Sequence, residues 1–251
     1  MDSLDVGLRA LHLPAFVANW RIFARRAQEQ GMSPPEFLQS LVDCELSERS
    51  RRRVERLLKQ SRLPPGKTLS AFDLKRVPAK VRNQISALLD GSFLRDPLNV
   101  LVFGNPGTGK THLVAALGHQ LVLSGHSVLF TQTYALVQRL LRAKKELSLK
   151  RELSRLDRIE CLIVDDLGYV QQEREEMEIL FTLFAERYER RSVVVTSNLV
   201  FSKWDRIFKD PMTTTAAIDR LVHHCVVIEL DVPSYRTEEA KRRNKSKKFT
   251  N

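Results

Sequence analysis

A glycine-rich run near the middle of the sequence has the residue types and the spacing of a phosphate-binding loop. It follows the pattern G-x-x-x-x-G-K-T, and its members are Gly104, Asn105, Pro106, Gly107, Thr108, Gly109, Lys110 and Thr111. Glycines let backbone N–H groups surround phosphate oxygens, while the lysine reaches the β- and γ-phosphates and the threonine hydroxyl binds Mg²⁺. An apolar run precedes the loop and a helical pattern follows it, which is the context that the motif requires. The loop therefore predicts a site for ATP with Mg²⁺.

Two consecutive carboxylates end a second apolar run about 55 residues later. Residues 160–164 predict a buried strand, and Asp165 and Asp166 follow it. A carboxylate at this place suits Mg²⁺ held through water, and we assign that role to Asp165. Asp166 suits a catalytic role as the base, or as the group that orients water toward the γ-phosphate. The pair supplies the second half of the nucleotide site.

Later segments offer further polar residues. Asn198 follows a predicted strand at residues 192–196, where it could orient a water molecule, touch the γ-phosphate or cap the strand. Arg220 ends a short predicted helix, and it either acts in trans as an arginine finger or forms a surface salt bridge.

His223 and His224 have the chemistry of zinc ligands. No further His or Cys pair lies at ligand spacing, so the sequence predicts no zinc site.

The elements that must position these residues alternate between strands and helices. Strand patterns cover residues 99–103, 127–131, 160–164, 192–196 and 225–231, and helical patterns cover residues 110–124, 134–158, 173–190 and 213–222. This alternation predicts an α/β fold, in which one parallel sheet of five strands is covered by helices on both faces.

The first quarter of the chain follows a helical pattern instead. An apolar stripe runs over residues 4–30, where Pro14 breaks it, and a second helix is predicted from residues 33–36 to about residue 60. A proline- and glycine-rich breaker at residues 63–66 marks a linker. We expect four parts: a small, basic, all-helical N-terminal domain (1–66), a connector (67–98), the nucleotide-binding core (99–236) and a basic tail (237–251).

The composition of the 251 residues is that of a soluble globular protein, with 43% apolar and 28% charged residues. It excludes collagen-like and wholly disordered chains. No apolar run approaches the roughly 18 residues of a membrane span. The N-terminus lacks a signal-peptide pattern, and the three cysteines lie far apart. We therefore expect no membrane partner and a cytoplasmic location.

Positive charge gathers in three places. The net charge is +11; residues 1–68 and 231–251 each carry +4, and residues 139–158 carry +5 within an almost neutral core. These clusters predict a nucleic-acid or phosphate surface, and the alternative is a set of solvated helix faces. On the basic helix before residue 60, the contact candidates are Arg51, Arg52 and Arg53.

With these motifs the chain resembles the IstB-like ATPases, the transposition helper proteins of insertion sequences. They belong to the AAA+ clade that includes DnaC-type helicase loaders and DnaA. The resemblance covers nearly the whole chain, and residues 219–224 (DRLVHH) and 234–236 (SYR) are its most specific parts. The likeness also includes residues 68–73 (TLSAFD), the loop with His112 after it (105–112), residues 164–168 (VDDLG) and residues 196–198 (TSN).

The resemblance implies an AAA+ P-loop ATPase that forms homo-oligomers through its ATPase domains. Such proteins bind and deform double-stranded DNA and present it to a transposase, and ATP hydrolysis would release the assembly. By motif match, Asn198 becomes the sensor-one residue, Arg220 the arginine finger, and Arg236 a second phosphate contact. The clade's extra helical insertion falls on residues 134–158, and the DNA-contact candidates there are Lys144, Lys145, Arg151 and Arg155.

Two departures from the family pattern change these expectations. Only about 20 residues follow the last predicted strand, which is too few for a helical lid, so we expect no C-terminal lid domain. Asp166 stands where the family commonly has glutamate, and its shorter side chain predicts slow turnover.

Three rival functions remain open on the sequence alone. A replicative helicase loader would need a helicase-docking surface on the N-terminal domain. A small-molecule P-loop kinase would be monomeric and would need a pocket for its acceptor. An architectural DNA binder would use ATP only as a switch, and the intact Asp165–Asp166 pair argues against it.

Overall fold

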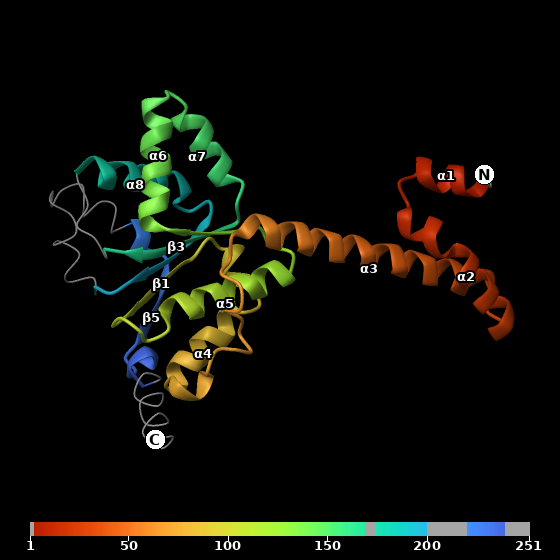
Figure 1. Cartoon of the computed structure of the whole chain (residues 1–251), viewed down its shortest axis with the longest axis horizontal. Helices are drawn as coiled ribbons and strands as arrows, with labels where there is room; N and C mark the ends of the chain where they lie inside the picture. Colours follow the sequence, from red (N-terminus) through yellow and green to blue (C-terminus); the bar gives the residue numbers. More distant parts are fainter. Residues whose placement is uncertain (1–2, 169–173, 200–219, 239–251) are drawn as a thin grey trace, which may run out of the picture. The chain divides into compact units, whose positions relative to one another are not determined.

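A sheet of five parallel strands organises the larger part of the chain. The computed structural model describes residues 3–168, 174–199 and 220–238, and the chain forms two compact units, Met1–Arg56 and Leu57–Asn251. The strands of the second unit are β1 (Asn99–Gly104), β2 (Val128–Gln132), β3 (Cys161–Leu167), β4 (Ser192–Ser197) and β5 (Cys225–Leu230). Their order is β2-β3-β4-β1-β5 (Figure 1). The predicted α/β class and five-stranded parallel sheet are confirmed.

Helices bury both faces of this sheet, which explains why its strands are continuous apolar runs. Successive residues of a strand point to opposite faces, and Leu101 and Phe103 share one core cluster with Leu140 and Leu180. Figure 1 shows the two helical layers, with α6 (Thr133–Lys145), α7 (Leu149–Asp157) and α8 (Arg174–Arg187) on one side and α4 (Ala79–Leu88) and α5 (Lys110–Leu123) on the other.

Strand β3 runs further than its apolar run predicts. The sequence places its end at residue 164, whereas β3 continues through Asp165 and Asp166 to Leu167. Its register against β4 shifts between Val164 and Leu167, and Asp166 has a left-handed backbone with φ of 60°. Irregularities of this kind bend a strand and redirect its side chains. As a result the two carboxylates have different surroundings: Asp165 is buried, whereas Asp166 is partly exposed.

The other predicted elements form with small changes of boundary. The segment 134–158 forms two helices, α6 and α7, which residues 146–148 join. The segment 67–98 contains α4 and two short 3₁₀ helices, η1 (Leu74–Arg76) and η2 (Ser92–Leu94). The helix expected near 213–222 and the tail expected at 237–251 lie largely outside the described residues. Within the described ranges, none of the helices combines the length and the apolar character that crossing a membrane requires.

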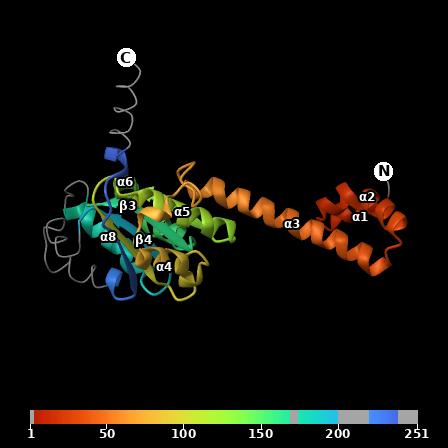
Figure 2. The same cartoon turned by 90° about the horizontal axis from the view of Figure 1, so that it is seen from below.

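The N-terminal unit is helical, as predicted. It contains α1 (Ser3–Ala10), α2 (Pro14–Gln30) and the first part of α3 (Pro34–Ser61), and α1 and α2 lie side by side (Figure 2). The predicted break falls at Pro14, where the Glu45 carboxylate accepts a hydrogen bond of 2.8 Å from the Ala15 N–H. Glu36 accepts hydrogen bonds from the backbone and hydroxyl of Ser33, which fixes the start of α3.

Candidate active site

The glycine-rich loop joins β1 to the N-terminus of α5, as its motif requires. Gly107 has a φ of +84°, and a Cβ atom there would lie 2.2 Å from the Ser234 hydroxyl oxygen. Gly109, with a φ of +102°, precedes α5, and no described side chain caps that helix end. The loop therefore leaves backbone N–H groups directed toward the space in front of α5, where the helix dipole favours an anion.

Lys110 lies at the centre of this loop. Its side chain is buried, and its ammonium group donates to the carbonyls of Gly104 at 2.7 Å and Asn105 at 3.1 Å. It also donates to the Asn198 amide oxygen, so the end of β4 and the loop meet at one cation. Burial lowers the pKa of Lys110, while the nearby carboxylates of Asp166 and Asp165 oppose that shift.

Asp165 is almost completely buried, with 2% of its surface exposed. The Thr196 hydroxyl donates to it at 2.6 Å and accepts from the Asp166 N–H at 2.9 Å. Burial raises the pKa of Asp165, and the Asp166 charge adds to the rise. Hydrogen bonds from Thr196 and Thr111 and the charge of Lys67 act in the opposite direction.

The donor set beside Asp165 fits Mg²⁺. The Thr111 hydroxyl lies close enough to the Asp165 carboxylate to lower the pKa of that group, so one hydroxyl and one carboxylate oxygen already lie near each other. Mg²⁺ in phosphate-transferring sites is held by one or two such oxygen ligands, with water and phosphate oxygens completing its shell. Asp166, which is half-exposed, lines the adjoining cavity.

A cavity of about 770 Å³ lies over the loop, which is within the size range of small-molecule sites. Outside the loop, the cavity is also lined by four residues that the sequence predicted to contact the nucleotide or to act in its hydrolysis: His112, Asp166, Asn198 and Arg236. The lining residues that sequence reasoning missed are Lys67, Ala71, Phe72, Asp73, Arg76, Val77, Val232 and Tyr235. The apolar members come from the segment before β1 and from the segment after β5, and only the fold brings these two segments together.

Two side chains hold the segment before β1 on the loop. The Phe72 ring packs edge-on against the His112 ring, with centroids 5.3 Å apart. A ring nitrogen of His112 lies 3.0 Å from the Thr68 carbonyl oxygen. On the opposite side, the Tyr235 N–H donates to the Gly107 carbonyl at 3.0 Å. His112 therefore positions a wall of the cavity in addition to lining it.

Arg220 lies apart from this cavity. It is exposed in the short helical segment before β5, and it is not among the described residues that line the cavity. The structure thus brings together Lys110, Thr111, Asp165, Asp166, Asn198 and Arg236, and it leaves Arg220 on the surface.

The basic candidates differ in how far other charges engage them. On α3, Arg51 pairs with Glu48 and Glu55, and Arg52 pairs with Glu48 at 2.9 Å; the side chains of Arg51, Arg52 and Arg53 are all exposed. In the α6–α7 pair, Lys144 contacts Glu175 at 3.0 Å and Arg155 contacts Glu152 at 3.3 Å, whereas Lys145 and Arg151 are exposed near the turn.

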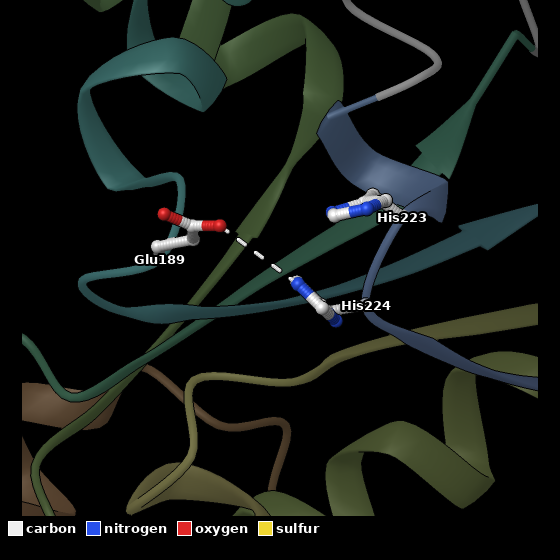
Figure 3. A group of neighbouring side chains, drawn as sticks. All are labelled: Glu189, His223 and His224. Carbon is white, nitrogen blue, oxygen red and sulfur yellow. Dashed lines mark ion pairs between the residues drawn. The ribbon is translucent and has the colours of Figure 1, made fainter.

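The two adjacent histidines gain one partner that their sequence spacing does not reveal. Glu189 lies beside them, its carboxylate 3.8 Å from the ring of His224 (Figure 3). One ligand atom from each of the three exposed side chains lies within 4.8 Å of the others. A closed zinc site has four ligands, and the described part of the chain adds no fourth to this group.

Comparison with known proteins identifies relatives along the whole chain. A family profile described as IstB-like ATP binding protein matches residues 6–245. A protein of Sinorhizobium fredii, named as an insertion sequence ATP-binding protein, is 45% identical over 238 residues, which cover 94% of this chain and 80% of that protein. The protein named as the ATP-binding protein of insertion sequence IS21 of Pseudomonas aeruginosa is 36% identical over 242 residues, covering 96% of this chain and 91% of that protein.

Solved structures share the fold at low identity. The DnaC helicase loader has a TM-score of 0.55 at 19% identity, and the match covers 66% of this chain and 97% of that chain. AMPPCP-bound DnaA from Aquifex aeolicus has a TM-score of 0.55 at 18% identity, covering 72% of this chain and 56% of that chain. The second unit therefore has the AAA+ fold.

Proposed function

The chain belongs to the family of IstB-like ATP binding proteins, and on that premise we propose that it is an ATPase that assembles on double-stranded DNA and delivers that DNA to a transposase. The observation that carries the proposal is the convergence of Lys110, Thr111, Asp166 and Asn198 at one cavity, with the buried Asp165 carboxylate near Lys110. Relatives that bear the names of insertion sequences support the transposition context.

In this proposal the cavity holds ATP as the substrate. Backbone N–H groups of the loop and Lys110 bind the phosphates, and Arg236 adds a second cation. Thr111 and Asp165 would hold Mg²⁺, which when bound neutralises charge on the β- and γ-phosphates. Phe72, Tyr235 and the apolar residues beside them give the base an apolar wall.

Asp166 and Asn198 act on the attacking water and the γ-phosphate. Asp166 reaches the cavity from the irregular end of β3 and orients the water as a base. The Asn198 amide oxygen accepts a hydrogen bond from Lys110, which leaves its amide nitrogen to donate to a phosphate oxygen. The charge of Lys67 favours the ionised form of Asp165, against the larger effect of burial, which raises the pKa of that carboxyl.

Arg220 completes the site of a neighbouring copy of the chain. Its exposure outside its own cavity supports action in trans, where a guanidinium stabilises charge in the transition state of phosphoryl transfer. ATP then joins neighbouring copies into a homo-oligomer, and hydrolysis releases them. The exposed basic residues of α6 and α7 face DNA phosphates in this assembly, and such contacts are largely independent of sequence.

A mixing experiment tests the shared site. Lys110→Ala and Arg220→Ala are each expected to lose ATP hydrolysis, measured as phosphate release in the presence of duplex DNA. An equimolar mixture is expected to regain part of the activity, because Arg220 of the first variant meets the intact loop of the second. Arg95→Ala, an exposed arginine elsewhere, serves as the control with unchanged activity. Full activity of Arg220→Ala on its own would exclude the role in trans.

A further inference from the structure

The turn between α6 and α7 presents an apolar side chain to solvent. Leu147 is 95% exposed, the highest value among the exposed large apolar residues of the described chain. The turn lies at the end of the α6–α7 pair that is remote from the sheet (Figure 1). An apolar side chain in this position contributes nothing to the core of the protein.

The backbone at Leu147 is also unfavourable for leucine. Its φ is 53°, in the left-handed region that costs a residue with a Cβ atom free energy. The Ser148 N–H donates to the Ala143 carbonyl at 2.8 Å and the Leu147 N–H to the Lys144 carbonyl at 3.1 Å. These two bonds form a Schellman motif, in which glycine is the usual residue at the position of Leu147. Exposure and backbone strain therefore coincide at one leucine that glycine would replace without loss to the fold.

The surroundings of the leucine are basic. Between residues 144 and 151, Lys144, Lys145, Lys150 and Arg151 stand against one acidic residue, Glu146. All five are exposed, and Lys144 also contacts Glu175. An apolar side chain between cations is complementary to a DNA groove, because the side chain can contact the stacked bases while the cations bind the flanking phosphates.

The two helices that carry the turn with Leu147 are firmly packed on the core. Leu136 and Leu140 of α6 and Leu156 of α7 are buried in the main core cluster. The buried guanidinium of Arg187 donates to the Leu156 carbonyl at 2.8 Å, which ties the end of α7 to α8. A side chain that separates base pairs must keep its position against the force of base stacking, and the packing of α6 and α7 on the core provides this rigidity.

From these observations we propose that Leu147 is a wedge that inserts between adjacent base pairs of duplex DNA and bends the duplex, while the flanking lysines and Arg151 bind the phosphates on either side. Apolar side chains that enter base steps unstack them and bend DNA. The inference rests on the proposed function, because it needs an assembly that binds duplex DNA, and it adds how that assembly deforms the DNA.

The test uses the full chain with ATP, Mg²⁺ and a duplex of roughly 50 base pairs, longer than an ordinary bent site. Energy transfer between dyes at the two ends of the duplex reports bending, and the fluorescence of 2-aminopurine within it reports unstacking. The wild-type chain is expected to raise both signals. Leu147→Gly and Leu147→Asn are expected to bind about tenfold more weakly and to lose both signals. Leu147→Met, which keeps an apolar side chain, is expected to retain them.

Stability separates a lost wedge from a damaged fold. Leu147→Gly is expected to melt at a higher temperature than the wild-type chain, because glycine adopts the left-handed backbone without strain. Leu123→Asn alters a leucine that is 63% exposed on α5 and is expected to leave bending unchanged. Wild-type bending by Leu147→Gly overturns the wedge alone. A wild-type chain that binds no duplex overturns the proposed function, and the wedge with it.

Discussion

Asp165 is a carboxylate that the folded chain removes almost completely from water, and this burial raises its pKa. A carboxyl group whose pKa is higher in the folded than in the unfolded state opposes folding while it is ionised. That penalty is fully present above the raised pKa, and it disappears as the pH falls through that pKa toward the unfolded value. The buried Asp165 carboxylate therefore reduces the stability of the nucleotide-free protein at neutral pH, and the proposed function makes this group a metal ligand.

Asp165→Asn is accordingly expected to raise the melting temperature of the nucleotide-free protein in a chelating buffer at neutral pH, while abolishing ATP hydrolysis. The difference in melting temperature from the wild-type chain is expected to shrink as the pH is lowered. Asp96→Asn, at an exposed position, controls for the loss of a charge. A melting temperature equal to or below that of the wild-type chain at neutral pH would contradict this account of Asp165.

The pair of carboxylates shows how much of the site the sequence predicts. Their place after an apolar strand and their distance from the glycine-rich loop were enough to predict the residues. Their different surroundings were not predictable, because these depend on an irregular register against β4 that leaves no mark in the residue types. Thr196 was missed for a related reason: its hydroxyl meets Asp165 only through the pairing of β3 with β4.

Among the helices, α8 contributes a buried cation that holds three segments together. The Arg187 guanidinium is 1% exposed and donates to the carbonyls of Leu156 at 2.8 Å, Ile159 at 2.9 Å and Ser192 at 2.9 Å. Burial lowers its pKa to about 10, so the group stays charged at neutral pH. The end of α7, the approach to β3 and the start of β4 are thus joined by one side chain.

Replacing Arg187 with methionine keeps the apolar stem but leaves these buried carbonyls without donors. Each unsatisfied buried group costs about 1–3 kcal/mol, so we expect Arg187→Met to lower the free energy of unfolding by about 3 kcal/mol or more. Arg191→Met is the matched control, because Arg191 is exposed and its side chain donates to the Asp157 carbonyl at the surface. Urea denaturation of both variants measures the difference; equal losses would contradict the role of Arg187.

At the scale of elements the sequence predicts the sheet better than the connections. Apolar runs such as residues 99–103 predicted strands whose observed ends differ by one to three residues, since burial on both faces leaves a clear pattern. The turn at Leu147 was not located, because leucine gives no turn signal where glycine would. Arg187 gave no signal either, since arginine in a helix is normally solvated.

The chain combines a nearly neutral nucleotide-binding core with separate basic segments, and this distribution of charge suits the proposed assembly on a polyanion. Arg51 and Arg52 on α3 pair with Glu48 and Glu55, and Lys144 near the α6–α7 turn pairs with Glu175. We therefore assign the proposed DNA binding mainly to the exposed Lys145, Lys150 and Arg151 beside that turn. The family and the AAA+ fold were predictable from motifs, whereas the cavity wall was not, because residues 67–77 and 232–236 meet only in the folded chain.

In the proposed function, ATP shared between neighbouring copies builds the assembly on DNA. Mass photometry on a duplex of roughly 50 base pairs, with ATP, with ADP and with the Lys110→Ala variant, tests it most directly; the length exceeds the roughly 20–30 base pairs of an ordinary bent site. We expect complexes of many chains that need both ATP and DNA and that are absent with Lys110→Ala. A single chain under every condition would rule out this assembly and the role of Arg220 in trans.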